Sequence, residues 1–206
     1  IIHEGGALSA YFCYYPHMNI KSAVFVKGVV GEDDILNDGL PQVAFLGRSN
    51  VGKSSVINTL VQKKELARSS STPGMTRQIN FFLINKDFYL VDLPGYGFAK
   101  GSKEDRKVLA NLIEWYALHS GVNQKLIVLI VDAEVGVTAS DKEILGYLED
   151  AEKKVVVVAN KIDKVKKSIL KKQLDSIADQ AHPYPVIPYS TLNKIGVGEL
   201  TNAILK

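Results

Sequence analysis

The segment Gly47 to Ser55, which reads GRSNVGKSS, limits the possible folds more than any other part of the chain. It follows an apolar run, Val43 to Leu46, and precedes residues with helical spacing. A glycine-rich turn between a strand and a helix presents a row of backbone N–H groups, and the charge of Lys53 stands beside them. Lys53 can reach the β and γ phosphates, and the Ser54 hydroxyl can ligate magnesium. The segment therefore predicts a nucleotide-binding α/β fold, without saying which nucleotide binds.

Composition places the chain among ordinary globular proteins. Its 206 residues are 46% hydrophobic and 23% charged, which fits one medium-sized domain with its own core. No apolar run reaches the roughly 18 residues that indicate a membrane span. The single Cys13 excludes an internal disulfide framework, and no Cys/His spacing indicates zinc. We expect a soluble, cytoplasmic protein.

The first 17 residues, IIHEGGALSAYFCYYPH, differ in character from the rest of the chain, and Met18 begins a segment typical of a native start. We expect residues 1–17 to be a leader that is foreign to the fold or poorly ordered. Residues 18–206 are expected to form a single domain, because neither repeats nor a domain linker can be found in them.

The formal net charge is +3, and the lysines are clustered. One run, KVKKSILKK, extends from Lys164 to Lys172, and a second group contains Lys100, Lys103, Arg106 and Lys107. Basic clusters provide salt-dependent affinity for phosphate backbones, so they favour a nucleic-acid partner. For the first run, lysines of an amphipathic helix that simply face water are an equally simple explanation.

Apolar segments alternate with helical patterns along the whole chain. Continuous apolar runs such as LIVLIV and VVVVA need cover on both faces, which indicates a mostly parallel sheet between helices. A polar stretch at 64–78 predicts a mobile loop, and the segments around Asn85-Lys86-Asp87 predict a hairpin. The expected strands are 23–30, 43–46, 79–84, 88–91, 126–131, 155–159 and 186–189, and the expected helices are 53–62, 104–119, 140–150, 168–181 and one from 197.

Asp92-Leu93-Pro94-Gly95 follows the expected strand 88–91 directly. Asp92 then lies at a carboxyl end of the sheet, where the ligands of such folds gather. A carboxylate there can hold magnesium through a water molecule, and the Gly95 N–H can meet a γ phosphate. The tetrapeptide alone is also typical of an ordinary turn, so its position after the strand carries the prediction.

Asn160-Lys161-Ile162-Asp163 follows the strand 155–159 and selects the base. The Asp163 carboxylate can accept hydrogen bonds from N1–H and the 2-amino group of guanine, whereas adenine offers no such pair of donors. A helix-capping Asn with a surface Asp is the alternative for this tetrapeptide alone. Tyr189-Ser190-Thr191 can complete the base pocket with a backbone N–H, a prediction that rests on its position only.

With these motifs in order, the chain from about residue 21 to its end resembles the translation-factor-related GTPases, and among them the EngB (YihA/YsxC) family of bacterial ribosome-assembly GTPases. The resemblance rests on GRSNVGKSS, on STPGMTRQINFF from Ser71 to Phe82 and on VDLPGYGFAK from Val91 to Lys100. It implies a three-layer Ras-like P-loop GTPase domain, with a mostly parallel six-stranded sheet, one antiparallel strand and helices on both faces.

The resemblance also implies a function. The protein would bind and hydrolyse GTP with magnesium, associate with the large ribosomal subunit through RNA or protein during its assembly, and be needed for normal cell division and septation. Binding to DNA is not expected, and a monomer is.

Site residues are implied by the resemblance, motif by motif. Ser54 and Thr76 are expected to ligate magnesium directly and Asp92 through water, while switch two would run from Leu93 to about Lys103. Asn50 matches an asparagine that holds potassium in cation-dependent relatives, and a turn-forming Asn is the alternative. The expected GTP contacts are Gly47, Arg48, Ser49, Asn50, Val51, Gly52, Lys53, Ser54, Ser55, Gly74, Met75, Thr76, Arg77, Gln78, Asp92, Leu93, Pro94, Gly95, Asn160, Lys161, Ile162, Asp163, Tyr189, Ser190 and Thr191.

Two positions depart from the patterns of related GTPases. Tyr96 stands where Ras-like enzymes carry the glutamine that orients the attacking water, so we predict slow intrinsic hydrolysis and name no catalytic residue. Leu192 stands where many GTPases have the lysine of a Ser-Ala-Lys triplet. Two other functions remain open: a P-loop kinase, against which the guanine motif argues, and a nucleotide-binding structural protein without significant hydrolysis.

Overall fold

The computed structural model describes residues 20–36, 38–67, 78–97, 107, 111–119 and 121–206. Within them, seven strands form one sheet in the order β1-β3-β4-β2-β5-β6-β7. The strands are β1 (Ala23–Val29), β2 (Gln42–Gly47), β3 (Ile79–Ile84), β4 (Phe88–Asp92), β5 (Gln124–Asp132), β6 (Val155–Asn160) and β7 (Val186–Pro188).

One strand runs against the other six. β3 pairs antiparallel with both β1 and β4, whereas β2 pairs parallel with β4 and β5, and β5, β6 and β7 continue the parallel series. The predicted class, with a mostly parallel sheet and one antiparallel strand, is confirmed. The expected number of six strands is wrong, because β1 extends the sheet beyond β3.

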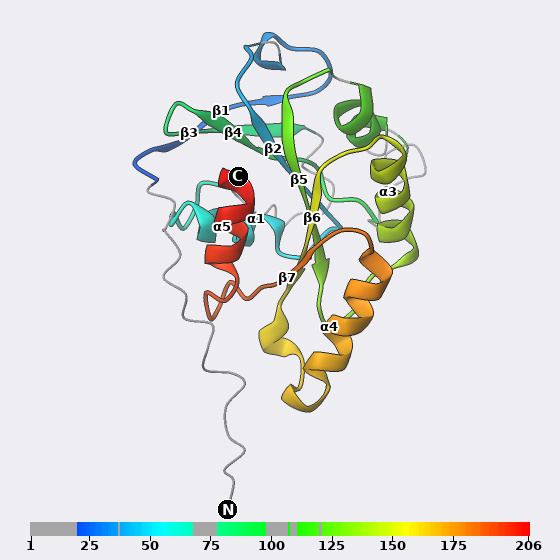
Figure 1. The fold of residues 1–206 in the computed structure, drawn as a ribbon. Helices are drawn as coiled ribbons and strands as arrows, with labels where there is room; N and C mark the ends of the chain where they lie inside the picture. The colour runs from blue at the N-terminus through cyan, green and yellow to red at the C-terminus, as the bar shows by residue number, and fades with distance from the viewer. Residues whose placement is uncertain (1–19, 37, 68–77, 98–106, 108–110, 120) are drawn as a thin grey trace, which may run out of the picture.

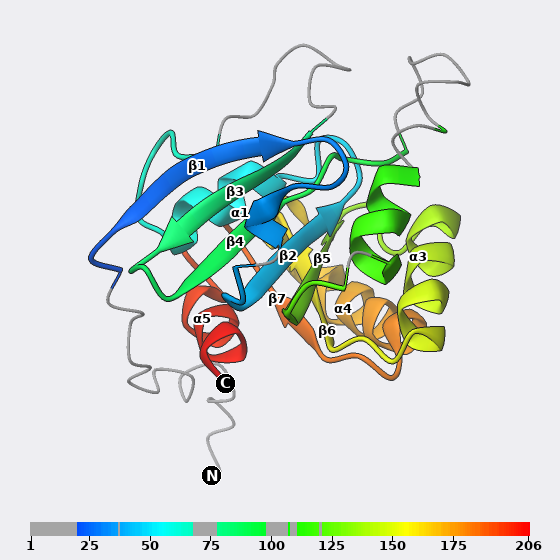
Figure 2. The ribbon, with the colours of Figure 1, turned by 90° about the horizontal axis from the view of Figure 1, so that it is seen from above.

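Helices cover both faces of the sheet (Figures 1 and 2). On one face lie α1 (Lys53–Leu60) and α5 (Val197–Leu205), and on the other lie α3 (Ala139–Asp150) and α4 (Lys167–Ala181). Two short 3-10 helices are η1 (Asp34–Leu36) and η3 (Ile162–Lys164), and a π-helical turn, η2 (Trp115–His119), ends the helical segment around residues 111–119.

The sheet separates two hydrophobic cores, and strand periodicity assigns side chains to each. Val43 and Phe45 of β2 pack with the α1 and α5 side, while Ala44 and Leu46 pack with the α3 and α4 side. Burial of alternate residues on both faces explains why the parallel strands read as continuous apolar runs. The arrangement brings the carboxyl ends of the parallel strands to one edge of the sheet, because their directions agree.

Candidate functional site

The predicted phosphate loop connects the end of β2 at Gly47 to the start of α1 at Lys53. Gly52 is the N-cap of α1, with a left-handed φ of 96°, and no side chain among the described residues makes a capping hydrogen bond to this helix. The first N–H groups of a helix have no intrahelical partner and lie at the positive end of its dipole. Because no described side chain caps them, these groups offer an anion site that a nucleotide phosphate fits.

Two glycines of the loop are required by close contacts. A Cβ atom on Gly52 would lie 2.5 Å from Asn160 Nδ2, and a Cβ atom on Gly47 would lie 2.8 Å from the Ile130 carbonyl oxygen. The loop is therefore pressed against β5 and β6, and any side chain at either position would push it away.

Lys53 contacts Asp92, the carboxylate that is predicted to hold magnesium through water. The Lys53 Nζ atom makes a short ion pair with Asp92 Oδ1, and the two side chains are 11% and 5% exposed. Asp92 ends β4 and lies opposite Phe45 of β2 in the parallel register. The fold thus brings Ser54, which follows Lys53 in the first turn of α1, and Asp92 to the same end of the sheet.

The segment after Asp92 lies along the phosphate loop. The Ser49 N–H donates to the Tyr96 carbonyl oxygen at 2.9 Å, and the Tyr96 N–H donates to the Gly47 oxygen at 3.3 Å. The Ser49 hydroxyl also donates to the Gly95 oxygen at 3.3 Å. These bonds fix the backbone around Gly95 beside the loop that the sequence assigns to the phosphates.

The Tyr96 side chain is buried. It is 8% exposed, and its hydroxyl donates to Asp141 Oδ1 at 2.6 Å. Burial, followed by the negative charge of Asp141, raises the pKa of Tyr96 far above its ordinary range, so the phenol stays neutral and donates. The group that replaces the Ras-type glutamine is therefore directed into the start of α3.

Asn160 and Lys161 brace the phosphate loop from the end of β6. Asn160 Nδ2 donates to the Val51 carbonyl oxygen at 2.9 Å, and Lys161 Nζ donates to the Asn50 oxygen at 2.7 Å. Lys161 Nζ is also 2.7 Å from Asp132 Oδ2. Sequence reasoning missed Asp132 as a site residue, although its place at the carboxyl end of β5, opposite Asn160, is a signal that could have found it.

The predicted base-recognition residues lie together. Asp163, in η3, is exposed, and its Oδ1 atom accepts a hydrogen bond from the Ser190 hydroxyl at 2.5 Å. Ser190 itself is fully buried. Its hydroxyl also accepts from the Asn193 N–H at 3.1 Å, which ties the loop after β7 to Asp163.

The backbone hydrogen bonds of the loop after β7 show which of its N–H groups could donate to the guanine base. The Tyr189 N–H already donates to the Ala159 oxygen, and the Ser190 N–H donates to the Ile195 oxygen. Within the described residues the Thr191 N–H has no backbone partner, so it is the group of the three that stays available. Leu192, which replaces the lysine of the Ser-Ala-Lys triplet, has a 76% exposed side chain.

Several predicted site residues lie outside the described residues. They are Gly74, Met75, Thr76 and Arg77 of the expected first switch, the part of the second switch beyond Gly97, the leader 1–17, and Lys100, Lys103 and Arg106. Gln78 is described and exposed, and its Nε2 atom donates to Asn80 Oδ1 at 3.1 Å.

The donor set fits magnesium held together with phosphates. In the described part of the chain, no group of three or more His, Cys, Asp or Glu side chains could hold a metal ion by themselves. Magnesium is usually bound by one or two carboxylates together with substrate phosphates and water, and Asp92 with the Ser54 hydroxyl provides such an incomplete set. On the base side, the buried Asn160 Oδ1 atom has no hydrogen-bond partner among the residues that the structure describes.

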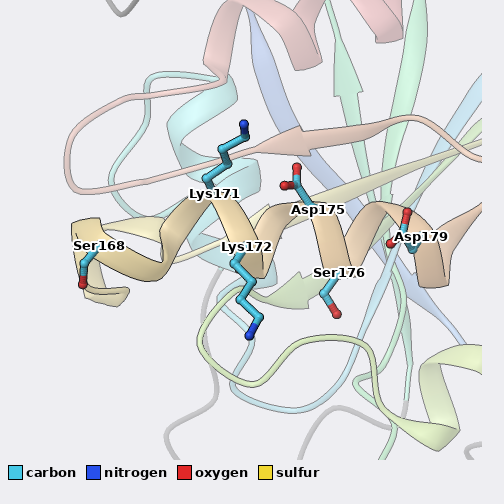
Figure 3. Close-up of a pocket in the computed structure, with 6 residues that line it drawn as sticks. All are labelled: Ser168, Lys171, Lys172, Asp175, Ser176 and Asp179. Carbon is cyan, nitrogen blue, oxygen red and sulfur yellow. The ribbon is translucent and has the colours of Figure 1, made fainter.

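A separate hollow of about 540 Å³ lies along α4. Its lining consists of lysine, aspartate and serine side chains that leave the helix in different directions (Figure 3). None of the described residues of the nucleotide motifs lines it. The lining residues are Ser168, Lys171, Lys172, Asp175, Ser176 and Asp179.

Comparisons with known proteins show the family to which the chain belongs. Residues 42–161 match the family model described as 50S ribosome-binding GTPase, and residues 119–206 match that of the elongation factor Tu GTP-binding domain. A probable GTP-binding protein EngB from Clostridium perfringens (strain SM101 / Type A) is 44% identical over 90% of this chain and 95% of its own length. The chain belongs to the EngB family.

Other relatives extend the likeness. An EngB protein of Lactobacillus helveticus (strain DPC 4571) is 42% identical over 91% of this chain and 97% of its own length. A crystal structure of a probable EngB GTP-binding protein has a TM-score of 0.66 at 28% identity, covering 80% of this chain and 96% of that one. Era in complex with MgGDPNP and nucleotides 1506–1542 of 16S ribosomal RNA has a TM-score of 0.62 at 28% identity, covering 81% and 56% of the two chains.

Membership of the EngB family makes this protein a GTPase that binds GTP and GDP. A P-loop kinase and a protein that never hydrolyses its nucleotide are therefore both set aside. Among the described residues, no helix combines the length and the apolar character that crossing a membrane requires.

Proposed function

We propose that this EngB-family GTPase is a molecular switch that assists assembly of the large ribosomal subunit. The observation that carries the proposal is the match of residues 42–161 to a family described as 50S ribosome-binding GTPases. The Era structure, which contains a fragment of ribosomal RNA, supports an RNA-related role for this kind of domain. GTP and magnesium would order the loops around Thr76 and Gly95, and the ordered surface would bind the subunit.

Each motif residue has a proposed role at the nucleotide. Lys53 and the N-terminus of α1 bind the phosphates, and the Gly95 N–H meets the γ phosphate. Ser54 and Thr76 hold magnesium directly and Asp92 holds it through water, while the ion, when bound, neutralises phosphate charge. Asp163 reads guanine, and the hydroxyl of Ser190 at 2.5 Å fixes its orientation.

Substitution of Asp163 by Asn tests the base pocket. The Asn side chain presents an N–H group to the 2-amino group of guanine, and two donors cannot form a hydrogen bond. Xanthine nucleotides carry an oxygen at that position and should become preferred. Two charge-assisted bonds of about 1.5–3 kcal/mol each correspond to a change in relative affinity of about a hundredfold to ten-thousandfold. Competition between GTP and XTP measures it, and unchanged GTP preference would contradict the assignment.

Slow intrinsic hydrolysis is proposed from the position of Tyr96. Its hydroxyl is engaged by Asp141 and its side chain is 8% exposed, so it is poorly placed to orient water at a γ phosphate. A cation or a ribosomal partner would then provide the missing acceleration, which in Ras with its activator is about 10⁵-fold. Single-turnover hydrolysis with and without large subunits measures this.

The basic start of α4 is proposed as a second ribosome-binding surface, in addition to the loops that GTP orders. Lys166 is the N-cap of α4 and Lys167 its first residue, and no described side chain makes a capping hydrogen bond there. Positive charge at a helix N-terminus opposes the helix dipole, so folding alone does not favour lysines there. Their exposure suits contact with an RNA backbone. The exposed lysines of this surface are Lys164, Lys166, Lys167, Lys171 and Lys172.

Co-sedimentation with separated ribosomal subunits tests the switch. The GTP-bound protein should sediment with large subunits more strongly than the GDP-bound protein, and not with small subunits. A Lys166→Gln/Lys167→Gln/Lys171→Gln variant should bind more weakly, with the salt-dependence slope reduced by about two. Changing the exposed Lys86, Lys142 and Lys154 to Gln is the matched control. Binding that ignores nucleotide and salt would contradict the proposal.

Further parts of the proposal rest on the family resemblance. We propose that the protein is a cytoplasmic monomer, that Asn50 contributes to a potassium site, and that its loss impairs cell division and septation. Depletion in the cell should produce filaments together with a deficit of mature large subunits. Filaments without that deficit would separate the division role from ribosome assembly.

A further inference from the structure

A buried carboxylate at the start of α3 joins two loops of the nucleotide site. Asp141, which is fully buried, is the third residue of α3. Its Oδ1 atom accepts from the Tyr96 hydroxyl at 2.6 Å, and its Oδ2 atom lies 3.3 Å from Arg48 Nε. Tyr96 directly follows Gly95, and Arg48 belongs to the phosphate loop. One side chain therefore contacts both loops.

Helix capping explains only part of this arrangement. Asp141 Oδ2 accepts from the Thr138 N–H at 2.8 Å, and the Asp141 N–H donates to the Thr138 hydroxyl oxygen at 3.4 Å, which together form a capping box. Oδ2 also accepts from the Thr138 hydroxyl at 2.7 Å. An exposed carboxylate could do the same. Complete burial, the contact with Tyr96 and the nearby Arg48 are additional, and burial of a charge is costly unless it is paired and hydrogen-bonded.

The positive charge of Arg48 compensates the buried negative charge of Asp141. Its side chain is 22% exposed, yet Nε and Nη2 are buried and have no hydrogen-bond partner among the described residues. Among the described residues, the ion pair with Asp141 is therefore what holds the guanidinium group of Arg48 in place. Through it, the charge at α3 acts on the phosphate loop itself.

We propose that Asp141 is a positioning residue that holds Gly95 against the phosphate loop through Tyr96, and thereby favours GTP over GDP. The backbone bonds from the Ser49 N–H to Tyr96 and from the Tyr96 N–H to Gly47 show how closely the two loops lie. A Cβ atom on Gly95 would lie 3.0 Å from Ser49 Cα, so the segment has little room to shift. The inference rests on the proposed contact between the Gly95 N–H and a γ phosphate, which GDP lacks.

Preorganisation gives the expected sign. If the Gly95 segment is already held where the γ phosphate arrives, binding of GTP does not have to order it. Loss of the tether should then weaken GTP and leave GDP almost unchanged, because GDP makes no contact with that segment. A residue that only stabilised the fold would affect both nucleotides equally.

Substitution of Tyr96 by Phe is the decisive variant, because it removes the hydroxyl and keeps the ring. Isothermal titration with magnesium, GDP and a non-hydrolysable GTP analogue should show the analogue weakened about fivefold or more, relative to GDP. Tyr89→Phe is the matched control: Tyr89 is also buried, and its hydroxyl donates to Asp38 at 2.7 Å, at the opposite end of β4. It should leave the ratio unchanged.

Asp141→Asn provides a second measurement with similar side-chain size and without the charge. It should lower the ratio of GTP-analogue affinity to GDP affinity. The effect of the double variant with Tyr96→Phe should be smaller than the sum of the two single effects, since both substitutions disrupt the same hydrogen bond. An unchanged or increased GTP preference in Tyr96→Phe would overturn the inference, while a wild-type protein with no preference for guanine nucleotides would instead overturn the proposed function.

Discussion

At the scale of single residues, the pair of Lys53 and Asp92 shows what a nucleotide must replace. Both side chains are largely buried and each provides the other's opposite charge. In the proposed complex a phosphate takes the place of Asp92 beside Lys53, and hydrated magnesium takes the place of Lys53 beside Asp92. Entry of either one alone would leave a buried charge without its partner, which is unfavourable.

Substitution of Lys53 by Ala should act on both binding and stability. Triphosphate affinity should fall strongly because the charge next to the phosphates is lost. Asp92 would also be left without its ion-pair partner, at a cost of about 1–3 kcal/mol in the free energy of unfolding. Calorimetric titration and denaturant unfolding measure the two effects, and retention of full affinity would rule out the assigned role of Lys53.

Tyr89 gives a prediction for alkaline pH. Burial and, after it, the hydrogen bond with Asp38 raise the pKa of Tyr89 from 10.0 to about 12. Because the folded pKa exceeds the unfolded one, the stabilisation is fully present below pH 10 and is lost as the pH rises towards 12.

Tyr89→Phe should lack this loss. The difference in unfolding free energy between wild type and variant should shrink by about 1–3 kcal/mol between pH 10 and pH 12. Urea unfolding of both proteins across that range measures it, and the other tyrosines cancel because both proteins contain them. A difference that stays constant with pH would show that Tyr89 titrates normally.

Site residues were predictable where a local pattern marks them and unpredictable elsewhere. Asp92 and Asp163 occur in recognisable tetrapeptides after apolar runs, so the sequence indicates their places in the site. Asp132 and Asp141 act through Lys161 and Tyr96, which lie 29 and 45 residues away along the chain. No local signal announces a contact between segments so distant, and only the fold brings them together.

At the scale of helices and strands, periodicity predicted most boundaries to within one or two residues. α3 begins at Ala139 where 140 was expected, and α1 ends at Leu60 where 62 was expected, because Gln62 takes a left-handed φ of 54°. The π-helical turn η2 could not be predicted, since its apolar spacing resembles that of an α-helix.

The connection between β2 and α1 gives a prediction at this scale. Gly52→Ala would place a side chain at a φ of 96° and 2.5 Å from Asn160 Nδ2. The loop should shift away from β6, lowering stability by about 1–3 kcal/mol and weakening nucleotide binding. Thermal unfolding and calorimetric titration measure these effects.

Gly146 provides the matched control, because it lies on the exposed side of α3 and a Cβ atom there would meet nothing within 4 Å. Gly146→Ala should stabilise the protein by about 0.5–1 kcal/mol without affecting binding. Equal behaviour of the two alanine variants would show that the contact between Gly52 and Asn160 does not shape the loop.

At the scale of the whole molecule, the proposed nucleotide site collects residues from the ends of β2, β4, β5, β6 and β7. All five strands belong to the parallel part of the sheet, and helices on both faces fix their positions (Figure 2). The rate of GTP hydrolysis should therefore depend on all the loops at this edge of the sheet. The effect of a monovalent cation on that rate tests whether these loops act together.

Replacement of potassium by sodium at constant ionic strength should slow GTP hydrolysis if Asn50 helps to hold a cation. Asn50 is exposed, with a φ of 68°, and its carbonyl oxygen is engaged by Lys161, which leaves its side chain for this role. Asn50→Ala should remove the difference between the two cations. Equal rates in wild type would dismiss the potassium site.

The bonds from Asn160 and Lys161 to Val51 and Asn50 limit how this GTPase can change its nucleotide in evolution or design. Both residues stand in the motif that is proposed to read the base, yet their side chains hold the loop that is proposed to bind the phosphates. A substitution there would damage binding of every nucleotide before it altered the choice among them. Asp163, whose side chain makes no contact with that loop among the described interactions, is the position where base preference can drift independently.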